Sequence, residues 1–479
     1  MKIKEILTED KDVFTDAEAS VADKEAGRPV FKVEKVKKGD VYFLLKGDSV
    51  KEAKEALGKG AVCVFTENKN ENGFFIEVSD IRKALALYSA SFYGHPERKL
   101  KIIGVTGTNG KTTTANIIAH LLKKSGYKTA LIGTLGAEVG KKKLSTSLTT
   151  PDPDEFFALL AKAAESEIDY VVTEVSAHAI FFRKLYGLEL KYCVFTNLSR
   201  DHLDFFESME RYGRVKKSIF CYGQVKNAVV NTDDELGREI FRDRKGRTLT
   251  YGLYNPAEVF ALDCKYRKET EFLVNAFDEI EYITTKLSGE FNLYNTLAAM
   301  TVVSDIGIPL AYIKESLLSL TPPEGRFNVL QGSGFKVIID YAHTPDGLEK
   351  VLTAARGITE NSLICVFGCG GNRDREKRPL MGETVQRLSD LCIITSDNPR
   401  DENPEDIIAD ILAGADRAGK SHIAIPDRKK ALLFALRIAH EGDTVVIAGK
   451  GAEKYMEIKG EKIPFNDKEI CEEYLGRRN

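Results

Sequence analysis

Residues 102–113 read Ile102-Ile103-Gly104-Val105-Thr106-Gly107-Thr108-Asn109-Gly110-Lys111-Thr112-Thr113, an apolar run that passes into a glycine loop with a single lysine. Behind the loop, apolar residues recur at Ile117, Ile118, Leu121 and Leu122, the spacing of one helix face. A strand, a glycine loop and a helix in this order predict an α/β unit with a phosphate site, because loop N–H groups and a helix start attract anions. The residues predicted to contact a nucleotide here are Gly107, Thr108, Asn109, Gly110, Lys111, Thr112 and Thr113.

Two residues of this loop carry its expected chemistry. Lys111 can reach the terminal phosphates of a nucleotide, and the Thr112 hydroxyl can hold Mg²⁺. The strict P-loop pattern has a glycine where this chain has Val105, although the Gly-Lys-Thr core remains. A turn that binds no nucleotide would not need a lysine at this position, so phosphate binding is the favoured interpretation.

The alternation of strand and helix continues outward from the loop. Toward the C-terminus, further strands are predicted to end at Thr134, Glu174, Thr196 and Asn231, with a helix from Asp154 to Glu165. A linker at 322–325 precedes a fresh α/β unit. Its predicted elements are strands at 337–340, 363–367, 391–395 and 444–448 and a helix at 345–355. The N-terminal region has predicted strands at 41–45 and 61–65 and a helix at 50–57.

This pattern predicts an α/β protein of three domains. Residues 1–97 form an N-terminal α/β substrate domain, and residues 98–326 form a central P-loop ATPase-like domain with a mostly parallel sheet. Residues 327–479 form a C-terminal Rossmann-like α/β domain. Polar residues cluster just after the predicted strands, at the sheet edge where open α/β folds bind ligands.

Composition excludes several classes of protein. The 69 Lys and Arg residues nearly balance the 72 Asp and Glu residues, so the formal net charge of −3 gives no global attraction to nucleic acid or anionic lipid. No apolar stretch approaches the roughly 18 residues of a membrane helix, and the N-terminus meets charge too soon for a signal peptide. The 8 Cys residues are scattered without a Cys-x-x-Cys pair. We expect a cytoplasmic protein that binds neither nucleic acid nor membrane.

The glycine loop resembles that of the Mur ligase family, the ATP-dependent ligases that build the peptide stem of bacterial cell walls. Other strings similar to the family follow in the same order. They are Thr149–Asp152, Glu174–His178, Thr196–Asp204, Gly289–Asn295, Gly325-Arg326, Asp340–Asp346, Gly368–Met381 and Asp397–Arg400. Within the family, these strings are most similar to the ligases that add the third residue of the stem.

The resemblance implies an ATP-dependent amide ligase of peptidoglycan precursor synthesis. ATP would convert a carboxylate of UDP-N-acetylmuramoyl-L-alanyl-D-glutamate into an acyl phosphate, which the amine of meso-diaminopimelate then attacks. Such transfers are accelerated by positioning and by cations on the phosphoryl oxygens. The family also implies a monomer that uses ATP and two Mg²⁺ ions.

The resemblance assigns roles around the phosphates. Lys111 and Arg326 would supply positive charge, and Glu174 and His202 match second-metal ligands of the family, with Thr112 at the first ion. Lys216 falls on the family's Tyr-x-x-Ala-Lys segment, in which the lysine is carbamylated by CO₂ and helps to position Mg²⁺. From the residues alone, Lys216 beside Lys217 is an exposed helical charge.

Further roles concern the nucleotide and the two other substrates. The residues matched to nucleotide contacts are Asn295, Asp340 and His343. For Asn295 the alternative interpretation is helix capping. Residues matched to acceptor binding are Thr149, Thr150, Ser176 and Lys184. Residues matched to the amino-acid donor are Arg373, Asn398, Pro399, Arg400, Gly449 and Glu453. An arginine pair for carboxylate and a glutamate for ammonium suit a zwitterionic donor. From the residues alone, Arg400 could instead pair at the surface with Asp401 and Glu402.

The acceptor side departs from the family. Phe31–Lys35 stands where relatives have Asp-Ser-Arg, Leu148 stands where many have Asn, and Phe182 and Lys184 replace Gln and Arg. On the donor side, Ala452 replaces a usual His. These changes leave open a divergent paralogue that joins a dibasic amino acid to another peptide acceptor. A folylpolyglutamate-type ligase and an inactive nucleotide-binding regulatory subunit rank lower.

Overall fold

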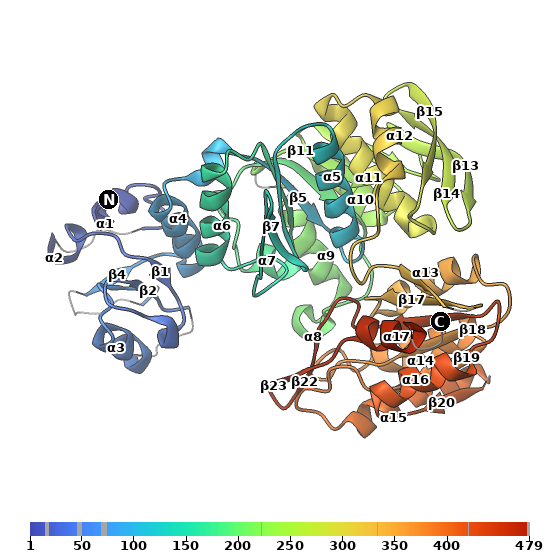
Figure 1. The fold of residues 1–479 in the computed structure, drawn as a ribbon. Coiled ribbons are helices and arrows are strands. Elements are labelled where there is room, and N and C mark those ends of the chain that lie inside the picture. Colours follow the sequence, from blue (N-terminus) through green and yellow to red (C-terminus); the bar gives the residue numbers. More distant parts are fainter. Residues whose placement is uncertain are drawn as a thin grey trace.

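The computed structural model describes residues 1–14, 19–45, 50–68, 74–221, 223–332, 334–419 and 421–476. Three units, each built on its own sheet, follow one another along the chain. The N-terminal unit lies at one end of the molecule beside the central unit, and the C-terminal unit packs below the other side of the central unit (Figure 1). Within the described ranges, none of the helices combines the length and hydropathy that a membrane span requires.

The N-terminal unit holds a four-stranded parallel sheet. Its strands, in spatial order, are β1 (Pro29–Val30), β2 (Val41–Phe43), β3 (Val64–Thr66) and β4 (Phe75–Glu77). Two of them were predicted: β2 is two residues shorter than the predicted 41–45, and β3 overlaps only the end of the predicted 61–65. Stacked Phe43 and Phe65 pack against Tyr88 of helix α4 (Ile81–Phe92), while α3 (Val50–Gly58) joins β2 to β3. Helix α4 continues the unit to the central sheet, where it contacts α6 (Pro153–Glu165).

The central unit is an eleven-stranded sheet in the order β15-β14-β13-β12-β11-β10-β5-β9-β6-β7-β8. Its parallel middle consists of β13 (Val259–Tyr266), β12 (Thr248–Gly252), β11 (Val225–Asn231), β10 (Leu190–Phe195), β5 (Lys101–Thr106), β9 (Tyr170–Glu174) and β6 (Thr129–Gly133). Antiparallel strands extend both edges: β14 (Thr270–Ala276), β15 (Glu279–Thr285), β7 (Gly136–Val139) and β8 (Lys142–Leu144). The mostly parallel sheet was predicted, whereas the two antiparallel edges were not.

Helices cover both faces of this sheet because its middle strands are buried on both sides. One apolar cluster joins β5 and β10 to α5 (Lys111–Lys124), α11 (Glu290–Ile306) and α12 (Leu310–Leu318). A second cluster on the opposite face includes Phe156 and Leu160 of α6 together with Ile219 and Phe220. Two-sided burial fixes the strand positions, so the loops at their carboxyl ends have a rigid support.

The C-terminal unit is a six-stranded sheet in the order β16-β17-β21-β18-β19-β20. Its strands are β16 (Asn328–Gln331), β17 (Lys336–Asp340), β18 (Leu363–Phe367), β19 (Leu391–Ile394), β20 (His422–Ala424) and β21 (Thr444–Ala448), and only β16 is antiparallel to its neighbour. The helices are α13 (Pro345–Arg356), α14 (Lys377–Leu388), α15 (Pro404–Ala415), α16 (Arg428–Ile438) and α17 (Asp467–Gly476). A hairpin of β22 (Tyr455–Ile458) and β23 (Glu461–Pro464) leaves the sheet after β21.

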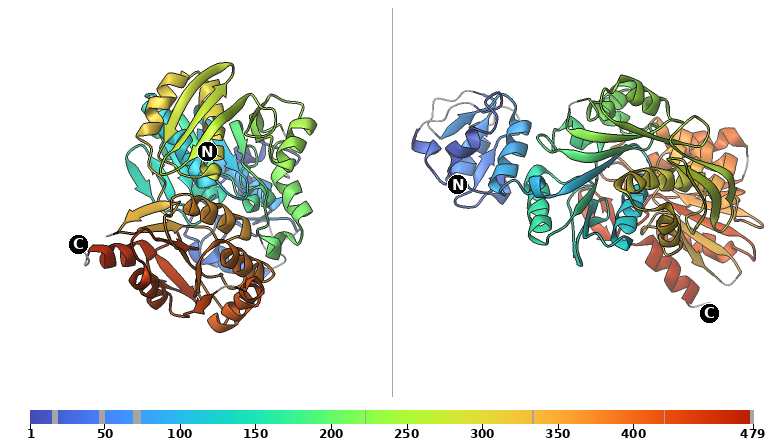
Figure 2. Two further views of the ribbon diagram at one scale, coloured as in Figure 1. Left: turned by 90° about the vertical axis from the view of Figure 1, so that its right-hand side faces the viewer. Right: turned by 90° about the horizontal axis from the view of Figure 1, so that it is seen from above.

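The turned views show that the C-terminal unit contacts the central unit and lies away from the N-terminal one (Figure 2). The linker residues before β16 bring Arg326 back to the central sheet. The carboxyl ends of β17 and β5 therefore face each other across one space, the site described next.

Candidate active site

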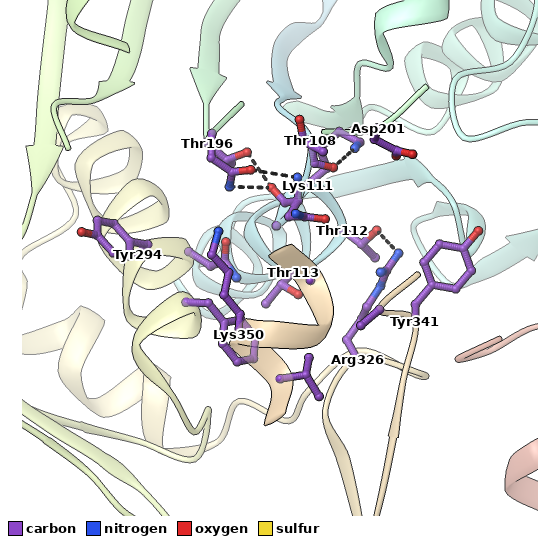
Figure 3. Close-up of a pocket in the computed structure, with 18 of the residues that line it drawn as sticks. Thr108, Lys111, Thr112, Thr113, Thr196, Asp201, Tyr294, Arg326, Tyr341 and Lys350 are labelled. Carbon is purple, nitrogen blue, oxygen red and sulfur yellow. Dashed lines mark hydrogen bonds between the residues drawn. The ribbon is translucent and has the colours of Figure 1, made fainter. Parts of the chain in front are cut away.

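The glycine loop between β5 and α5 has a backbone that only glycine permits at two positions. Gly107 and Gly110 have φ values of 144° and 86°. A Cβ atom on Gly107 would lie 1.9 Å from Thr196 Oγ1, and one on Gly110 would lie 2.3 Å from Asn295 Oδ1. Thr196 Oγ1 in turn donates to the Asn109 carbonyl at 2.7 Å, so the neighbouring strand β10 holds the loop in place (Figure 3). The loop is closed and rigid, as a phosphate site requires.

Lys111 folds back over this loop. Its Nζ donates to the carbonyls of Gly107 at 3.0 Å and Thr108 at 2.8 Å. Burial lowers the pKa of Lys111, while the nearby Glu174 carboxylate opposes that shift. The cation is thus held at the mouth of the loop, with carbonyl partners that a phosphate could replace.

Thr112 and Glu174 form the oxygen-rich centre of the site. Thr112 Oγ1 lies 3.0 Å from both carboxylate oxygens of Glu174, which also accepts the N–H of Thr134 at 2.8 Å. Arg326 Nη2 donates to the same Thr112 hydroxyl at 3.1 Å, and its guanidinium stacks on Tyr341 at 4.5 Å from the ring centroid (Figure 3). A cation from the linker therefore meets the glycine loop of the central sheet.

Lys216 is buried, and the interpretation of it as an exposed helical charge is wrong. It lies in α9 (Met209–Ser218) with 1% of its surface exposed, and its Nζ donates to the Gly107 carbonyl at 2.7 Å. Burial, helped by the positive charge of Lys111, holds the pKa of Lys216 well below its usual range. The side chain points inward, and its Nζ lies 4.6 Å from the ring centroid of Tyr212, one helix turn earlier.

Two histidines stand beside the phosphate loop. His202 is the N-cap of the short helix α8 (Leu203–Phe206), and burial lowers its pKa to about 3. Its ring meets the ring of His178 edge-on, with centroids 4.9 Å apart. Asp201 Oδ2 lies 3.3 Å from His202 Nε2 and 3.7 Å from Nε2 of His343 in the C-terminal unit. The sequence-based interpretation singled out neither His178 nor Asp201; their positions next to His202 in the two polar strings were the available signal.

One cavity of about 940 Å³ joins these groups to residues of the C-terminal unit. Asn295, Asp340 and His343 all line it. Asn295 lies inside α11, whose N-cap is Gly289, so it does not cap that helix. The Asp340 carboxylate accepts the N–H groups of Phe327 and Ala342, each at 2.7 Å.

The part of the cavity near α11 is aromatic, which the sequence did not indicate. Its lining there comes from β12, β13, α11 and α13. The residues are Tyr251, Tyr266, Phe291, Tyr294, Val351 and Ala354. Flat rings and aliphatic side chains beside a phosphate loop suit a nucleotide base.

All four predicted acceptor residues line the same cavity on its other side: Thr149, Thr150, Ser176 and Lys184. The Thr150 hydroxyl donates to the Glu174 carbonyl at 2.9 Å and accepts the Ser176 N–H at 3.0 Å. Lys184 is buried, and its Nζ pairs with Asp152 at 2.8 Å. Phe182 also lines the cavity, and the Arg82 guanidinium of the N-terminal unit stacks on its ring, 4.1 Å from the ring centroid.

The predicted donor residues fall into two groups. Arg373 lines the cavity and lies 3.6 Å from Asp204. The others form a separate cluster at the carboxyl ends of β19 and β21: Asn398, Pro399, Arg400, Gly449 and Glu453. Within the cluster, Asn398 Nδ2 donates to Glu453 Oε2 at 2.9 Å.

Two residues that the sequence reasoning missed complete this donor cluster. The fully buried Lys450 donates to Asn398 Oδ1 at 2.9 Å, and Glu457 of β22 accepts from Arg400 Nε at 3.2 Å. Arg400 Nη1 also donates to the Gly371 carbonyl at 2.6 Å. Arg400 therefore pairs with Glu457 rather than with Asp401 or Glu402.

Among the residues that the structure describes, no group of three or more His, Cys, Asp and Glu side chains is arranged to hold a metal ion. Thr112 and Glu174 offer side-chain oxygens beside the phosphate loop. Mg²⁺ in nucleotide sites commonly takes one or two protein oxygens and completes its shell with phosphate and water. The donor set therefore fits a Mg²⁺ ion that arrives with a nucleotide.

A phosphate loop that shares one cavity with a second α/β unit fits an ATP-dependent ligase. The chain belongs to the Mur ligase family: the Mur ligase middle domain matches residues 105–303, and the Mur ligase glutamate ligase domain matches residues 325–451.

Individual relatives agree with this assignment. The UDP-N-acetylmuramoyl-L-alanyl-D-glutamate--2,6-diaminopimelate ligase of Clostridium botulinum is 40% identical, over 94% of this chain and 96% of the relative. The enzyme of the same name from Aquifex aeolicus is 43% identical, over 92% of each chain. A solved structure of a ligase with this name superposes with a TM-score of 0.71 at 30% identity, over 100% of this chain and 99% of that one.

Proposed function

We propose that the chain joins meso-diaminopimelate to UDP-N-acetylmuramoyl-L-alanyl-D-glutamate with ATP, through an acyl phosphate, in peptidoglycan precursor synthesis. The single observation that carries this proposal is the cavity itself. It is lined at once by the glycine loop, by Thr149, Thr150 and Lys184, and by Arg373 of the C-terminal unit. A carboxylate, a nucleotide phosphate and an amine can therefore meet without crossing bulk water. The name shared by the relatives supports the choice of substrates.

The residues divide the work by charge. Lys111 and Arg326 approach the phosphoryl position from the central sheet and from the linker, and they stabilise the negative charge that develops during transfer. Lys184 binds the acceptor beside Thr150. Arg373, Asn398, Pro399, Arg400, Gly449 and Glu453 bind the donor.

We infer two Mg²⁺ sites and a carbamate as part of the same function. Thr112 and Glu174 would hold one ion, and Glu174 with the neutral His202 imidazole would contribute to the second. Bound Mg²⁺ supplies Lewis-acid charge on the phosphoryl oxygens. Lys216 suits carbamylation because burial lowers the pKa of its amine, and the uncharged form of an amine is the one that reacts with CO₂.

Other features follow from the same proposal. We also propose a monomer, as the resemblance to the family implies. The substrates are water-soluble and ATP is needed, which supports a cytoplasmic enzyme. We place the domain limits at 97/98 and 326/327; the first falls in the short 3₁₀ helix Pro96–Lys99, and the second directly precedes β16.

The test is ADP release by the purified protein with UDP-N-acetylmuramoyl-L-alanyl-D-glutamate across a panel of amino acids. We expect release that depends on both the acceptor and meso-diaminopimelate. Release with a different peptide acceptor only would favour the divergent paralogue, and release with a folate acceptor would favour the folylpolyglutamate type. Nucleotide binding without any release would identify a regulatory subunit and contradict the proposal.

A further inference from the structure

A fully buried ion pair lies directly beneath the donor cluster. Arg428, the first residue of α16, and Asp467, the first residue of α17, have no exposed side-chain surface. Arg428 Nε and Nη2 donate to the two carboxylate oxygens of Asp467 at 2.9 Å and 2.7 Å. Two parallel charge-assisted hydrogen bonds of this kind fix the plane of the guanidinium.

The remaining N–H groups of Arg428 point at two main-chain carbonyls. Nη1 donates to Ser396 at 3.2 Å, and Nη2 donates to Ala448 at 3.0 Å. Ser396 stands one residue before Asp397–Arg400, and Ala448 stands one residue before Gly449–Glu453. One guanidinium thus holds the starts of both donor segments, which are about 50 residues apart in the chain.

A third contact joins the two segments at their first residues. Asp397 Oδ2 lies 4.0 Å from Arg428 Nη1, and it sits where a side chain on Gly449 would begin, because a Cβ there would be 2.4 Å away. Asp397 Oδ1 accepts the N–H of Asn398 at 2.6 Å. The orientation of Asn398 therefore depends on the Asp397 carboxylate, which in turn lies next to the Arg428 guanidinium.

We infer that Arg428 and Asp467 are positioning residues for the amino-acid donor: they set the relative placement of the Asn398–Arg400 and Gly449–Glu453 segments and thereby the affinity for the donor. The inference rests on the proposed function, since it concerns the donor of that reaction. Neither residue lines the cavity that holds the phosphate loop, so we expect a smaller effect on the nucleotide than on the donor.

Stability and positioning can be separated because the pair can be removed as a unit. A single substitution leaves one buried charge without its partner and destabilises the fold. Replacing both residues by apolar ones of similar size, Arg428→Met with Asp467→Leu, removes both charges together and is commonly tolerated. The double variant lacks the donors to the Ser396 and Ala448 carbonyls and the cation that faces Asp397, so the placement of the donor segments is lost.

The experiment measures KM for meso-diaminopimelate and for ATP in the full-length double variant. We expect the donor KM to rise by about 10–100-fold while the ATP KM stays within about twofold. Leu436→Ala, a buried truncation on the same helix α16, is the control for general destabilisation and should leave the ratio of the two KM values unchanged.

Arg428→Lys provides a second variant if the double variant does not fold. It keeps a positive charge opposite Asp467, but a lysine cannot reach both carbonyls, so the donor KM should again rise selectively. A wild-type donor KM in either folded variant, or an equal rise in both KM values, overturns the inference. Absence of donor-dependent ADP release by the wild-type protein would instead contradict the proposed function.

Discussion

The glycine loop and the donor cluster solve the problem of ligand placement in opposite ways. The loop is a run of consecutive residues on one strand-helix connection, and backbone N–H groups and glycine conformations give it its shape. The donor cluster gathers side chains from the loops after β19 and β21 and from β22, and these side chains hold one another, as in the contacts of Asn398 with Lys450 and Glu453. Damage to the loop should therefore abolish the reaction, whereas damage to the cluster should change which amino acid is used.

The largest expected effect comes from Lys111→Ala. Removal of the cation at the loop should lower ADP formation by about 10³–10⁵-fold, the range for a lost cation at a transferring phosphoryl group. The measurement is kcat for ADP release at saturating substrates, with thermal unfolding to show that the fold is kept. Lys124→Ala, an exposed lysine at the end of the same helix, is the control. Retention of most of the wild-type turnover in Lys111→Ala would contradict the role of Lys111 in phosphate binding.

The next largest expected effect concerns selectivity for the amino-acid donor. We expect wild-type protein to prefer meso-diaminopimelate over lysine by about 10²–10⁴-fold, because lysine lacks the distal carboxylate that Arg400 would bind bidentately. When lysine is bound, the hydrogen bonds from Arg400 to the distal carboxylate are missing. Arg400 still has Glu457 and the Gly371 carbonyl as partners, so its charge is not left unpaired. The measurement is competition of the two amino acids under limiting ATP.

Arg400→Ala should remove most of this preference, and Arg356→Ala, which pairs with Asp390 elsewhere in the same unit, should not. Equal use of the two amino acids by the wild-type protein would rule out the distal-carboxylate role.

Lys216→Ala tests whether the buried lysine belongs functionally to the loop. If Lys216 carries a carbamate, its loss should reduce turnover by about 10²–10³-fold, and a high concentration of formate should restore part of it by returning a carboxylate to the space. Lys217→Ala is the matched control, because that side chain pairs at the surface with Glu239 and Asp243. An unmodified amine in a high-resolution map from crystals grown with bicarbonate would contradict the carbamate.

The smallest effect concerns the contact between the two units. Asn109 Nδ2 of the glycine loop donates to Asp346 Oδ2 of α13 at 2.7 Å. Asp346→Ala removes this hydrogen bond, worth about 1 kcal/mol, together with an ion pair to Lys350 of the same helix. The lost hydrogen bond should raise the ATP KM by about fivefold. Glu360→Ala, at an exposed ion pair with Lys336, should leave it unchanged. An unaltered ATP KM in Asp346→Ala would show that the two units meet without help from this contact.

Much of the fold could be predicted from local patterns. The strand Leu363–Phe367 and the strand Thr444–Ala448 were predicted to the residue, since short apolar runs between turn signals are typical of buried parallel strands. The edge strands β14 and β15 escaped prediction because a half-exposed strand mixes Glu271 and Glu281 with apolar residues, and the pattern competes with that of a loop.

The candidate site divides along the same line. Sequence by itself determined the glycine loop, the class of reaction and the residue types at the strand ends, because those depend on neighbours along the chain. Tertiary structure alone decided that Lys216 is buried against Gly107, that Arg400 pairs with Glu457, and that one guanidinium holds two distant donor segments. Burial and ion pairing depend on which elements pack together, and residues far apart in sequence carry no mark of that until the chain is folded.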